Sequence, residues 1–329
     1  MHAKLLILYY DSFLRVIITS ANLTSLDWES FENALFVQDF HRTKEKISDA
    51  PAFGRELYSF LGALKVPNFI RNSLTCYDFS TATVNLVPSI PGYHMYNQEQ
   101  TYGYLRIARI LQDNGLTVEP GDNGMKLEYQ TSAIGAIDEY WLREFYRSCS
   151  GGLAAKEVYK MKELPVDIVY PSQRTISNAE HAHNHQFHLK EAYYSRPNFP
   201  KALLRDSLCK QPGRLSHSKM FLAKLRKSIP LKGAEKTHVI GWDYIGSHNL
   251  SSGAWGRINN MVPGSRFRRM HFRINNFDLG VLRILTTDKI IDNPADLQSS
   301  LECLVTPSYT SPPPRYNHDD SPYFDPPDL

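Results

Sequence analysis

The chain has 329 residues, of which 42% are hydrophobic and 22% are charged, and its formal net charge is +3. These values are typical of a globular protein with enough chain for one large domain or two ordinary ones, and the charge is too small to argue for nucleic-acid binding by itself. Four scattered cysteines without a C-x-x-C pair favour free thiols over disulfides or a zinc site. The first apolar run, residues 5–10, is too short for a signal peptide or a membrane span.

Strand and helix patterns alternate along the chain and predict α/β layers. Residues 4–10 and 14–19 are apolar, rich in β-branched side chains and joined by a short turn, which predicts a hairpin. Helices are expected at residues 54–64, 99–112 and 137–146, and strands at 84–87, 126–130 and 166–170. A second strand pair is expected at 220–222 and 239–245, with a basic loop over 224–236. The Pro- and Gly-rich stretch 88–92 predicts a boundary between lobes, and residues 307–329 predict an irregular tail.

One short pattern occurs twice, near residue 2 and near residue 217. Each copy has a His-x-Lys tripeptide, then a Ser-x-Asn-Leu segment just beyond the next expected strand, then a tryptophan. The copies consist of His2, Lys4, Ser20, Asn22 and Trp28, and of His217, Lys219, Ser247, Asn249 and Trp255. From the serine to the tryptophan, equivalent positions are 227 residues apart without a gap. The repetition predicts one phosphate-handling site assembled from two similar halves.

These residue types suit phosphoryl transfer, in which negative charge builds on the oxygens around phosphorus. Lysine ammonium groups are compact charges suited to phosphate oxygens, and asparagine amides donate hydrogen bonds without adding charge. Two of each could replace a metal ion. Two histidines in one pocket can take opposite protonation states, one neutral to attack phosphorus and one protonated to supply a proton to the leaving group. A histidine nucleophile implies a covalent phosphohistidine that water then resolves.

The paired pattern resembles that of the phospholipase D superfamily, whose usual motif has an aspartate five residues after the lysine. Tyr9 and Lys224 stand at those positions, so the aspartate is absent from both copies. That absence, with further matching stretches, resembles the tyrosyl-DNA phosphodiesterase family. The stretches are residues 20–28, 91–92, 130–135, 170–172, 277–281 and 322–327. The similarity covers nearly the whole chain.

The resemblance implies an α/β fold of two similar phospholipase-D-like lobes, each a mixed sheet flanked by helices, with the active site between them. Residues 1–90 would belong to the first lobe, 91–306 would form the second, and 307–329 would be an irregular Pro-rich tail. Relatives carry a long segment before the first histidine and continue beyond the last matching stretch. We therefore expect a chain truncated at both ends, with an incomplete first lobe.

The family's pattern also implies a role for each site residue. His2 would be the nucleophile, and His217 would be the general acid and later the base. Asp278 would orient His2, and Asn33 would orient His217 as a shorter counterpart of the glutamine common in the family. The phosphate oxygens would be held by Lys4, Lys219, Asn22 and Asn249.

The implied activity is hydrolysis of the 3′-phosphotyrosyl link between DNA and a topoisomerase I peptide, without metal or cofactor. The tyrosine phenol, with a reference pKa of about 10, is a good leaving group that needs only modest acid help. The implied partners are DNA 3′ ends that carry tyrosine or a peptide, and topoisomerase I remnants. A DNA-repair role in the nucleus and a monomer without membrane association complete the expectation.

Weaker features remain outside the paired motif. Ser132, Ser251, Arg266 and Arg268 are the expected contacts to the DNA strand. The two arginines belong to a basic, aromatic-rich stretch, residues 265–273, which could track a DNA backbone or be a solvated loop. The histidines of residues 181–185 could bind a metal, although a polar loop is the preferred interpretation. The tripeptide from His188 to Lys190 lacks a downstream Ser-x-Asn-Leu segment and is interpreted as structural.

Two other functions stay open. A phospholipase-D-type nuclease or lipid phosphodiesterase would use the same paired motif, but the absent aspartates speak against it. An inactive truncated remnant, which only binds nucleic acid or does not fold, is the third hypothesis. Missing strands would leave open sheet edges, and His2 would lie on a fraying terminus.

Overall fold

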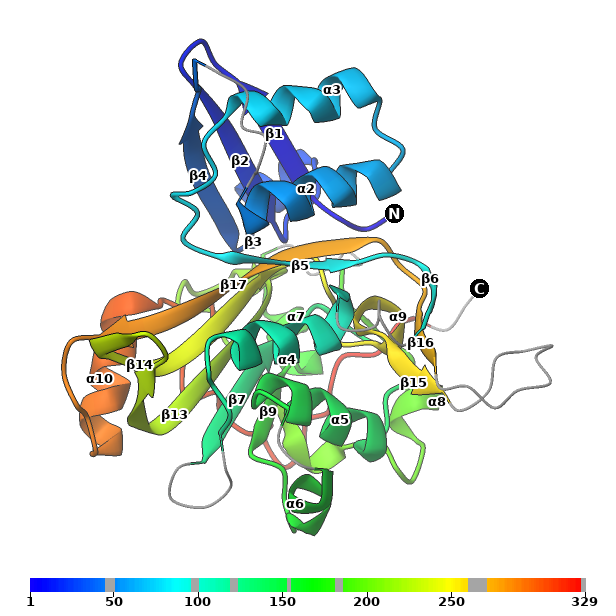
Figure 1. Cartoon of the computed structure of the whole chain (residues 1–329). Coiled ribbons are helices and arrows are strands. Elements are labelled where there is room, and N and C mark those ends of the chain that lie inside the picture. Colours follow the sequence, from blue (N-terminus) through cyan, green and yellow to red (C-terminus); the bar gives the residue numbers. More distant parts are fainter. Residues whose placement is uncertain are drawn as a thin grey trace, which may run out of the picture.

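The smaller of two lobes is built on the expected N-terminal hairpin (Figure 1). The computed structural model describes residues 1–44, 51–95, 101–118, 124–152, 155–180, 186–259 and 271–326. The antiparallel sheet of this lobe has the order β1-β2-β4, with β1 (Leu5–Tyr9), β2 (Phe13–Thr19) and β4 (Leu35–His41). Alternate residues of β2, Leu14, Val16 and Ile18, are fully buried because one face of the strand lies on the core. The helical segments of this lobe are α2 (Ala52–Ala63), α3 (Asn68–Ser73) and η1 (Leu74–Cys76).

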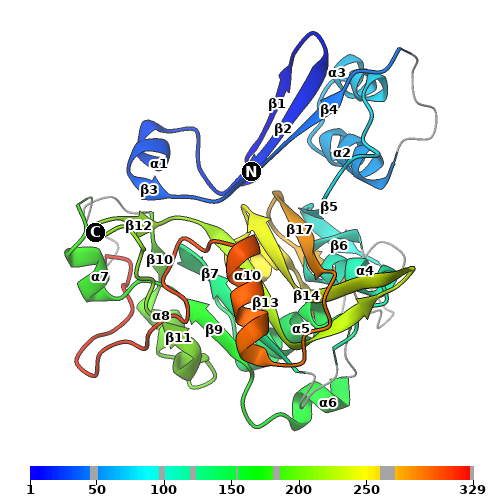
Figure 2. The ribbon, with the colours of Figure 1, turned by 90° about the vertical axis from the view of Figure 1, so that its left-hand side faces the viewer.

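A mixed sheet of seven strands forms the larger lobe. In order across the sheet, the strands are β11 (Leu204–Arg205), β9 (Val166–Val169), β7 (Met125–Gln130), β13 (Lys219–Leu231), β14 (Ala234–Gly246), β17 (Asp278–Thr287) and β5 (Asn85–Ser89). The pairs β11–β9 and β9–β7 are parallel and the others antiparallel. Helices α4 (Gly103–Asp113) and α5 (Glu139–Cys149) pack against one face, and α10 (Pro294–Leu304) lies on β13 and β14 from the other side (Figure 2).

Short elements complete both lobes. They are α1 (Ser25–Glu29), β3 (Phe31–Glu32), β6 (Gly92–His94), β8 (Ala133–Ile134), α6 (Ala155–Lys160), α7 (Gln173–Ser177), β10 (His188–Leu189), α8 (Glu191–Tyr194), η3 (Lys201–Leu203), β12 (Leu215–Ser216), α9 (Ser252–Trp255), β15 (Arg257–Asn259) and β16 (His271–Ile274). None of the helices in the described ranges is long and apolar enough to cross a bilayer.

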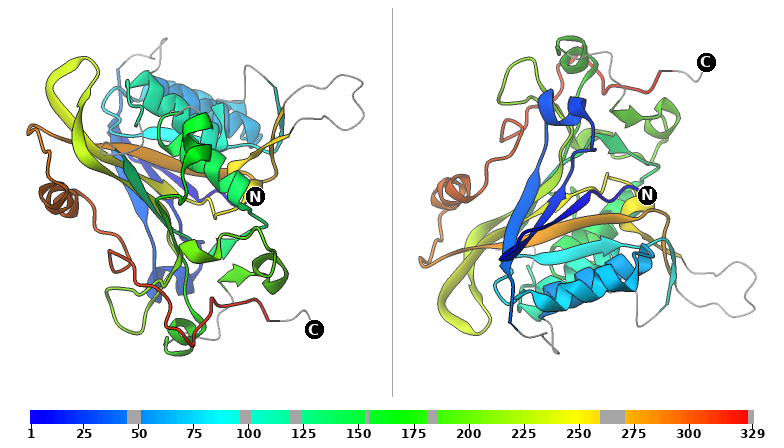
Figure 3. Two further views of the ribbon diagram at one scale, coloured as in Figure 1. Left: turned by 90° about the horizontal axis from the view of Figure 1, so that it is seen from below. Right: turned by 90° about the horizontal axis from the view of Figure 1, so that it is seen from above.

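The two lobes share core residues, so the site between them rests on a packed junction. Strand β2 contacts β14 and β17, and Leu279 and Val281 of β17 belong to the core of the smaller lobe. A second link is the parallel pairing of β3 with β12, in which Ser216 lies opposite Glu32. The view from above shows the N-terminus close to the ribbon of β17 (Figure 3). Position 2 therefore lies where the lobes meet.

Most expected elements are confirmed, with one correction in the second copy of the motif. The hairpin, the expected helices and the strands near residues 85, 126 and 166 are present within a few residues of the expected bounds. The basic loop expected over 224–236 is wrong, because β13 and β14 continue through it and leave only a short turn at residues 232–233. Strand β5 lies in the larger sheet although it precedes residue 90, and the division of the chain there stays a prediction.

Lys224 belongs to a buried polar cluster rather than to a loop. Its ammonium lies 2.7 Å from Oε1 of Glu128 on the neighbouring strand β7. The irregular tail completes this cluster, because the hydroxyls of Tyr309 and Ser311 donate to Oε2 of Glu128 over 3.2 and 3.0 Å. The tail has no helix or strand between residues 307 and 326, as expected, yet Tyr309 is fully buried.

We expect Gly280→Ala to destabilise the protein by about 1–3 kcal/mol, the usual cost of overpacking a core. A Cβ at this position would lie 2.2 Å from the ring of Tyr244, which fills the space that Gly280 leaves on the adjacent strand. The measurement is the free energy of unfolding in urea.

Gly253→Ala is the matched control, because its added Cβ would lie no closer than 3.8 Å to any atom. In helix α9 this change should be neutral or slightly stabilising. Equal destabilisation by both substitutions would contradict the overpacking argument.

Candidate active site

His2 is oriented by a buried carboxylate from the other lobe. Its Nδ1 lies 2.7 Å from Oδ1 of Asp278, the first residue of β17, and the backbone N–H of His2 donates to the carbonyl of Phe277. The hydroxyl of Ser247 donates to the same carboxylate oxygen over 2.7 Å. Burial would raise the pKa of Asp278, but its hydrogen bonds with His2 and Ser247 help to lower it below its usual value. The carboxylate thus holds Nδ1 and leaves Nε2 as the free ring nitrogen.

His217 is held in the reciprocal way by a carboxylate of the smaller lobe. Its Nδ1 lies 3.0 Å from Oδ2 of Asp27 in α1, a close electrostatic contact outside good hydrogen-bond alignment. The backbone N–H of His217 donates to the carbonyl of Glu32. Burial, followed by the positive charge of Lys219, lowers the pKa of His217 to about 4. The ring is therefore neutral at neutral pH in the structure as it stands.

The two copies of the motif keep the same hydrogen bonds around their serines, which places Asn33 opposite Asp278. Ser20 donates to Oδ1 of Asn33 over 2.8 Å, as Ser247 does to Asp278. The residue after each partner, Ala34 or Leu279, donates its N–H to the serine oxygen. Asn33 therefore occupies the place equivalent to that of Asp278, but its amide does not contact the histidine as expected.

The side chain that faces His217 is the Asp27 carboxylate and not the Asn33 amide that the resemblance implies. The Asn33 amide donates to the backbone carbonyl of Asp27 over 2.8 Å and forms no hydrogen bond with His217. Its short side chain ends there, and the Asp27 carboxylate faces the ring instead. That carboxylate also accepts the N–H of Asn22, while Trp28 donates its indole N–H to the Asn22 carbonyl. The Asp27-Trp28 dipeptide in the resembling stretch was the available signal for this contact.

Both lysines of the motif direct their ammonium groups back to the histidine two residues earlier. Lys4 donates to the carbonyl of His2 over 2.7 Å, and Lys219 to that of His217 over 2.6 Å. Lys219 also lies 2.7 Å from Nε2 of His217. Burial lowers the pKa of Lys4 to about 8, and burial together with the charge of Lys4 holds the pKa of the fully buried Lys219 well below its usual value. The cations of the two halves are therefore within electrostatic reach of each other.

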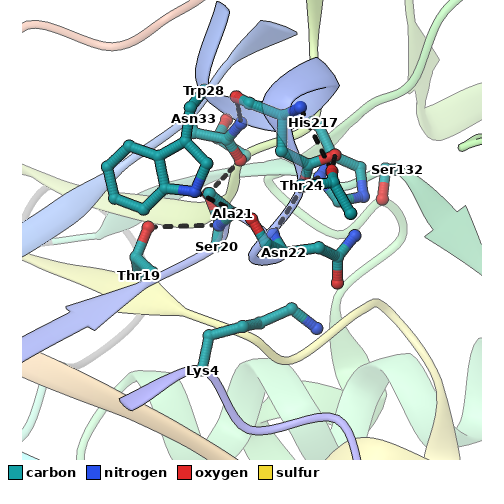
Figure 4. A network of polar contacts seen from close by, with 12 residues as sticks. Lys4, Thr19, Ser20, Ala21, Asn22, Thr24, Trp28, Asn33, Ser132 and His217 are labelled. Atoms are coloured by element: carbon teal, nitrogen blue, oxygen red, sulfur yellow. Dashed lines mark hydrogen bonds and ion pairs between the residues drawn. The ribbon is translucent and has the colours of Figure 1, made fainter. Parts of the chain in front are cut away.

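The two asparagines differ in their surroundings. In Figure 4 the side chains of Lys4 and Asn22 extend into the same space, with His217 beyond them. In the second copy of the motif, Oδ1 of Asn249 accepts hydrogen bonds from Thr131 and Ser132 over 3.2 and 3.3 Å. These contacts fix the amide and leave its NH₂ group for a ligand.

The expected DNA contacts divide into three cases. Ser132 is only 1% exposed and positions Asn249, so this geometry does not favour a direct contact with DNA. The Ser251 hydroxyl caps α9 by accepting the N–H of Ala254, and Ser251 lines a cavity of about 450 Å³ together with His2 and Asn249. Arg266 and Arg268 lie outside the described residues, as do the histidines of 181–185. Within the described ranges no group of three or more His, Cys, Asp or Glu side chains could hold a metal ion.

A buried histidine missed by sequence reasoning stands beside Asn249. His248 is fully buried where the first copy has Ala21, and its ring stacks on Trp255 at a centroid distance of 4.2 Å. Ser89 donates its hydroxyl to a carbonyl, so Nε2 of His248 donates to Ser89 over 2.9 Å, and Nδ1 accepts from the hydroxyl of Tyr244. Burial lowers the pKa of His248 to about 4, so the ring is neutral.

Comparison with known proteins decides the family. The profile of the tyrosyl-DNA phosphodiesterase family matches residues 1–317. The chain belongs to this family. Tyrosyl-DNA phosphodiesterase 1 of Arabidopsis thaliana is 27% identical over 308 residues, which cover 85% of this chain and 46% of the relative. The Drosophila melanogaster protein of the same name is 26% identical over 309 residues, covering 85% and 49%. The chain thus spans about half the length of these curated relatives.

Solved structures show the same fold. The crystal structure of yeast tyrosyl-DNA phosphodiesterase superimposes with a TM-score of 0.61 at 19% identity, covering 86% of this chain and 66% of the yeast chain. A single-residue mutant of the yeast protein gives a TM-score of 0.67 at 18% identity, with 98% and 76% covered. The expected α/β fold, a mixed sheet flanked by helices, is confirmed by this likeness.

We expect the free energy of unfolding to fall as the pH is lowered from 6.5 to 4. In this window His217 and His248 gain protons in the unfolded chain but stay neutral in the fold, where their pKa is about 4. Stability therefore rises with pH across the window, by at most about 3 kcal/mol for each ring. His248→Ala should remove about half of this slope in urea unfolding, while also lowering stability at every pH.

His318→Ala is the control, because the side chain of His318 is 98% exposed and its loss should leave the slope unchanged. A slope that His248→Ala does not reduce would contradict the assignment of His248 as a buried neutral ring.

Proposed function

We propose that this chain is a DNA-repair phosphodiesterase that hydrolyses the 3′-phosphotyrosyl link between DNA and a topoisomerase I peptide. The observation that carries the proposal is the reciprocal arrangement in which His2 is held by Asp278 and His217 lies against Asp27. Membership of the family supports it, and the curated relatives are named for this activity.

The first half of the proposed reaction forms a covalent intermediate. Nε2 of His2 attacks phosphorus, a P–N bond forms, and the bond from phosphorus to the tyrosine oxygen breaks. His217 gives its proton to the departing phenolate, so that tyrosine leaves neutral. Water then attacks phosphorus as His217 takes a proton from it, the P–N bond breaks, and DNA with a 3′-phosphate is released.

The side chains around phosphorus would supply the charge stabilisation that this reaction needs. Ammonium groups and amide donors preorganised in a buried site stabilise developing oxyanion charge far more than they would in water. We propose that no metal is required on this ground, since the described donors suffice in number and type. They are Lys4, Lys219, Asn22 and Asn249.

The charge of a bound substrate reconciles the low pKa of His217 with its role as the general acid. The acid role requires a protonated ring, whereas burial and the charges of Lys219 and Lys4 lower its pKa to about 4. A phosphodiester brings a negative charge into the pocket, which favours the protonated ring. It also offers the Lys219 ammonium an oxygen to bind in place of Nε2 of His217. His217 is therefore protonated, and able to act as the general acid, when substrate is present.

The family's role suggests the cellular setting. We infer action in the nucleus on 3′ ends of single strands that carry topoisomerase I remnants, by a monomeric protein. Cell fractionation would test the nuclear location, and light scattering of the purified chain would test the monomeric state.

We expect hydrolysis of a 3′-phosphotyrosyl oligonucleotide to persist in excess chelator and to fall at least about 10³-fold in His2→Ala. His217→Ala should lose about 10²–10⁴-fold. The loss in His217→Ala should be smaller with a 4-nitrophenyl leaving group, which needs less proton assistance, whereas His2→Ala should lose equally on both substrates.

Activity that survives both substitutions would refute the mechanism. Preferential cleavage of unmodified DNA or of a phospholipid in the same assay would favour the nuclease or lipid phosphodiesterase alternatives, and a chain without cooperative unfolding would favour the inactive remnant.

We expect Asp27→Asn to lower kcat about tenfold and to move the alkaline limb of the pH profile down by about one unit. Loss of a negative charge 3.0 Å from Nδ1 lowers the pKa of His217, so the acid loses its proton at lower pH. Asn33→Ala should leave the limb in place, because its amide contacts Ser20 and a carbonyl rather than the ring. A shift in Asn33→Ala but not in Asp27→Asn would restore the orienting role to Asn33.

A further inference from the structure

The proposed chemistry makes no use of the buried polar network around His248. This residue stands between Ser247, which donates to Asp278, and Asn249, a proposed phosphate ligand. Its ring is fully buried, although a polar ring is costly to bury unless its nitrogens are hydrogen-bonded. The first copy of the motif has Ala21 at the equivalent position, so the repeat itself does not require this ring.

Both ring nitrogens of His248 have partners on other elements. Nε2 donates to the hydroxyl of Ser89 in β5 over 2.9 Å, and that hydroxyl donates to the carbonyl of Ala254 in α9 over 2.6 Å. Nδ1 accepts the hydroxyl hydrogen of Tyr244 in β14. The indole of Trp255 stacks on the ring at a centroid distance of 4.2 Å. The ring is therefore held by β5, β14 and α9 together.

The backbone groups of His248 are hydrogen-bonded within the same network. Its N–H donates to the oxygen of Tyr244 over 3.4 Å, and its carbonyl accepts the hydroxyl of Tyr129 over 2.8 Å. The Tyr129 oxygen in turn accepts the indole N–H of Trp255 over 2.7 Å. Every polar atom of His248 thus has a partner, and a network in which all members are satisfied fixes the peptide that leads into Asn249.

The first copy of the motif holds its asparagine in a different way. The N–H of Asn22 donates to the carboxylate of Asp27, and its carbonyl accepts the indole N–H of Trp28, a side chain that is 49% exposed. The side-chain amide of Asn22 has no hydrogen-bond partner among the described residues. Asn249 has fixed amide partners as well as the buried ring next to it. The second copy is thus the more extensively hydrogen-bonded half of the site.

We propose that His248 is a positioning residue, which holds Asn249 so that its amide N–H meets a phosphate oxygen in the transition state. The assignment rests on the proposed function, because that function gives Asn249 a phosphate to bind. A donor that is held in place before the reaction stabilises developing oxyanion charge without a cost of reorganisation. A misplacement of about 1 Å can cost about 10²-fold in rate. His248 is fully buried and acts only through its neighbour.

Two matched substitutions each remove one hydroxyl from a fully buried tyrosine. Tyr244→Phe deprives Nδ1 of His248 of its donor, whereas Tyr309→Phe removes a contact with Glu128 in the polar cluster around Lys224. For the 3′-phosphotyrosyl oligonucleotide we expect Tyr244→Phe to lower kcat about three- to tenfold, as for one lost hydrogen bond, with KM unchanged. Tyr309→Phe should leave kcat within about twofold. Equal losses of kcat in the two variants would overturn the inference, because a general loss of stability would explain both.

A double-mutant cycle shows whether His248 acts through Asn249. Asn249→Ala should lower kcat about 10²–10³-fold, the usual effect of removing one such donor, and His248→Leu about 10- to 100-fold. In the Asn249→Ala background His248→Leu should cause no further loss, because the side chain that it positions is gone. His248→Gln, whose amide can still donate to Ser89, should keep more activity than His248→Leu. Additive losses in the cycle, or equal losses in the Leu and Gln variants, would contradict the positioning role.

A measurement without hydrolysis separates this inference from the proposed function. The side-chain amide of Asn249 gives a nitrogen NMR signal that Asn249→Ala identifies. We expect His248→Leu and Tyr244→Phe to shift or broaden this signal, and Tyr309→Phe to leave it in place. Such changes in a chain that hydrolyses no phosphotyrosyl substrate would refute the proposed function and leave the positioning of Asn249 intact. An active chain in which His248→Leu and Tyr244→Phe alter neither this signal nor kcat would refute the inference alone.

Discussion

The site depends on two histidine–carboxylate contacts that cross the junction between lobes in opposite directions. His2 precedes the first strand of the smaller lobe but is oriented by Asp278 of the larger sheet, and His217 of the larger lobe faces Asp27 of the smaller one. Each ring is also tied to the other lobe by a backbone hydrogen bond. Neither lobe can therefore shift without disturbing both rings, and the shared core around β17 resists that shift.

Burial strengthens the electrostatic effects of these contacts. Two lysines, two histidines and two carboxylates occupy a space where water is scarce, and desolvation is the largest influence on the pKa of His217 and on those of both lysines. Burial thus disfavours the charged forms of these groups, and a nearby negative charge would offset that effect. Preorganised charge of this kind favours a transition state in which negative charge is concentrated on phosphate oxygens.

Repetition and local sequence patterns were enough to predict part of the candidate site. The repeat identified the histidines, lysines and asparagines, and strand periodicity placed them at the ends of the hairpin strands. The sequence could not show that the Asn33 amide donates a hydrogen bond to the carbonyl of Asp27, because that contact depends on the path of the chain through α1. Nor could it show that residues 224–231 continue a strand, since their charges suggest a loop until Glu128 is seen to neutralise Lys224. Nor could the sequence show that His188 and Lys190 line the same cavity as His2, because that proximity arises from tertiary packing alone.

Asp325, which holds His188 in the wall of the cavity, is supplied by the irregular segment that follows the last helix. The same cavity is lined by His2, which precedes β1 in the sequence. During synthesis the cavity therefore stays incomplete until the segment that carries Asp325 has left the ribosome. A nascent chain that has already folded both sheets would still lack this carboxylate at the rim of the cavity.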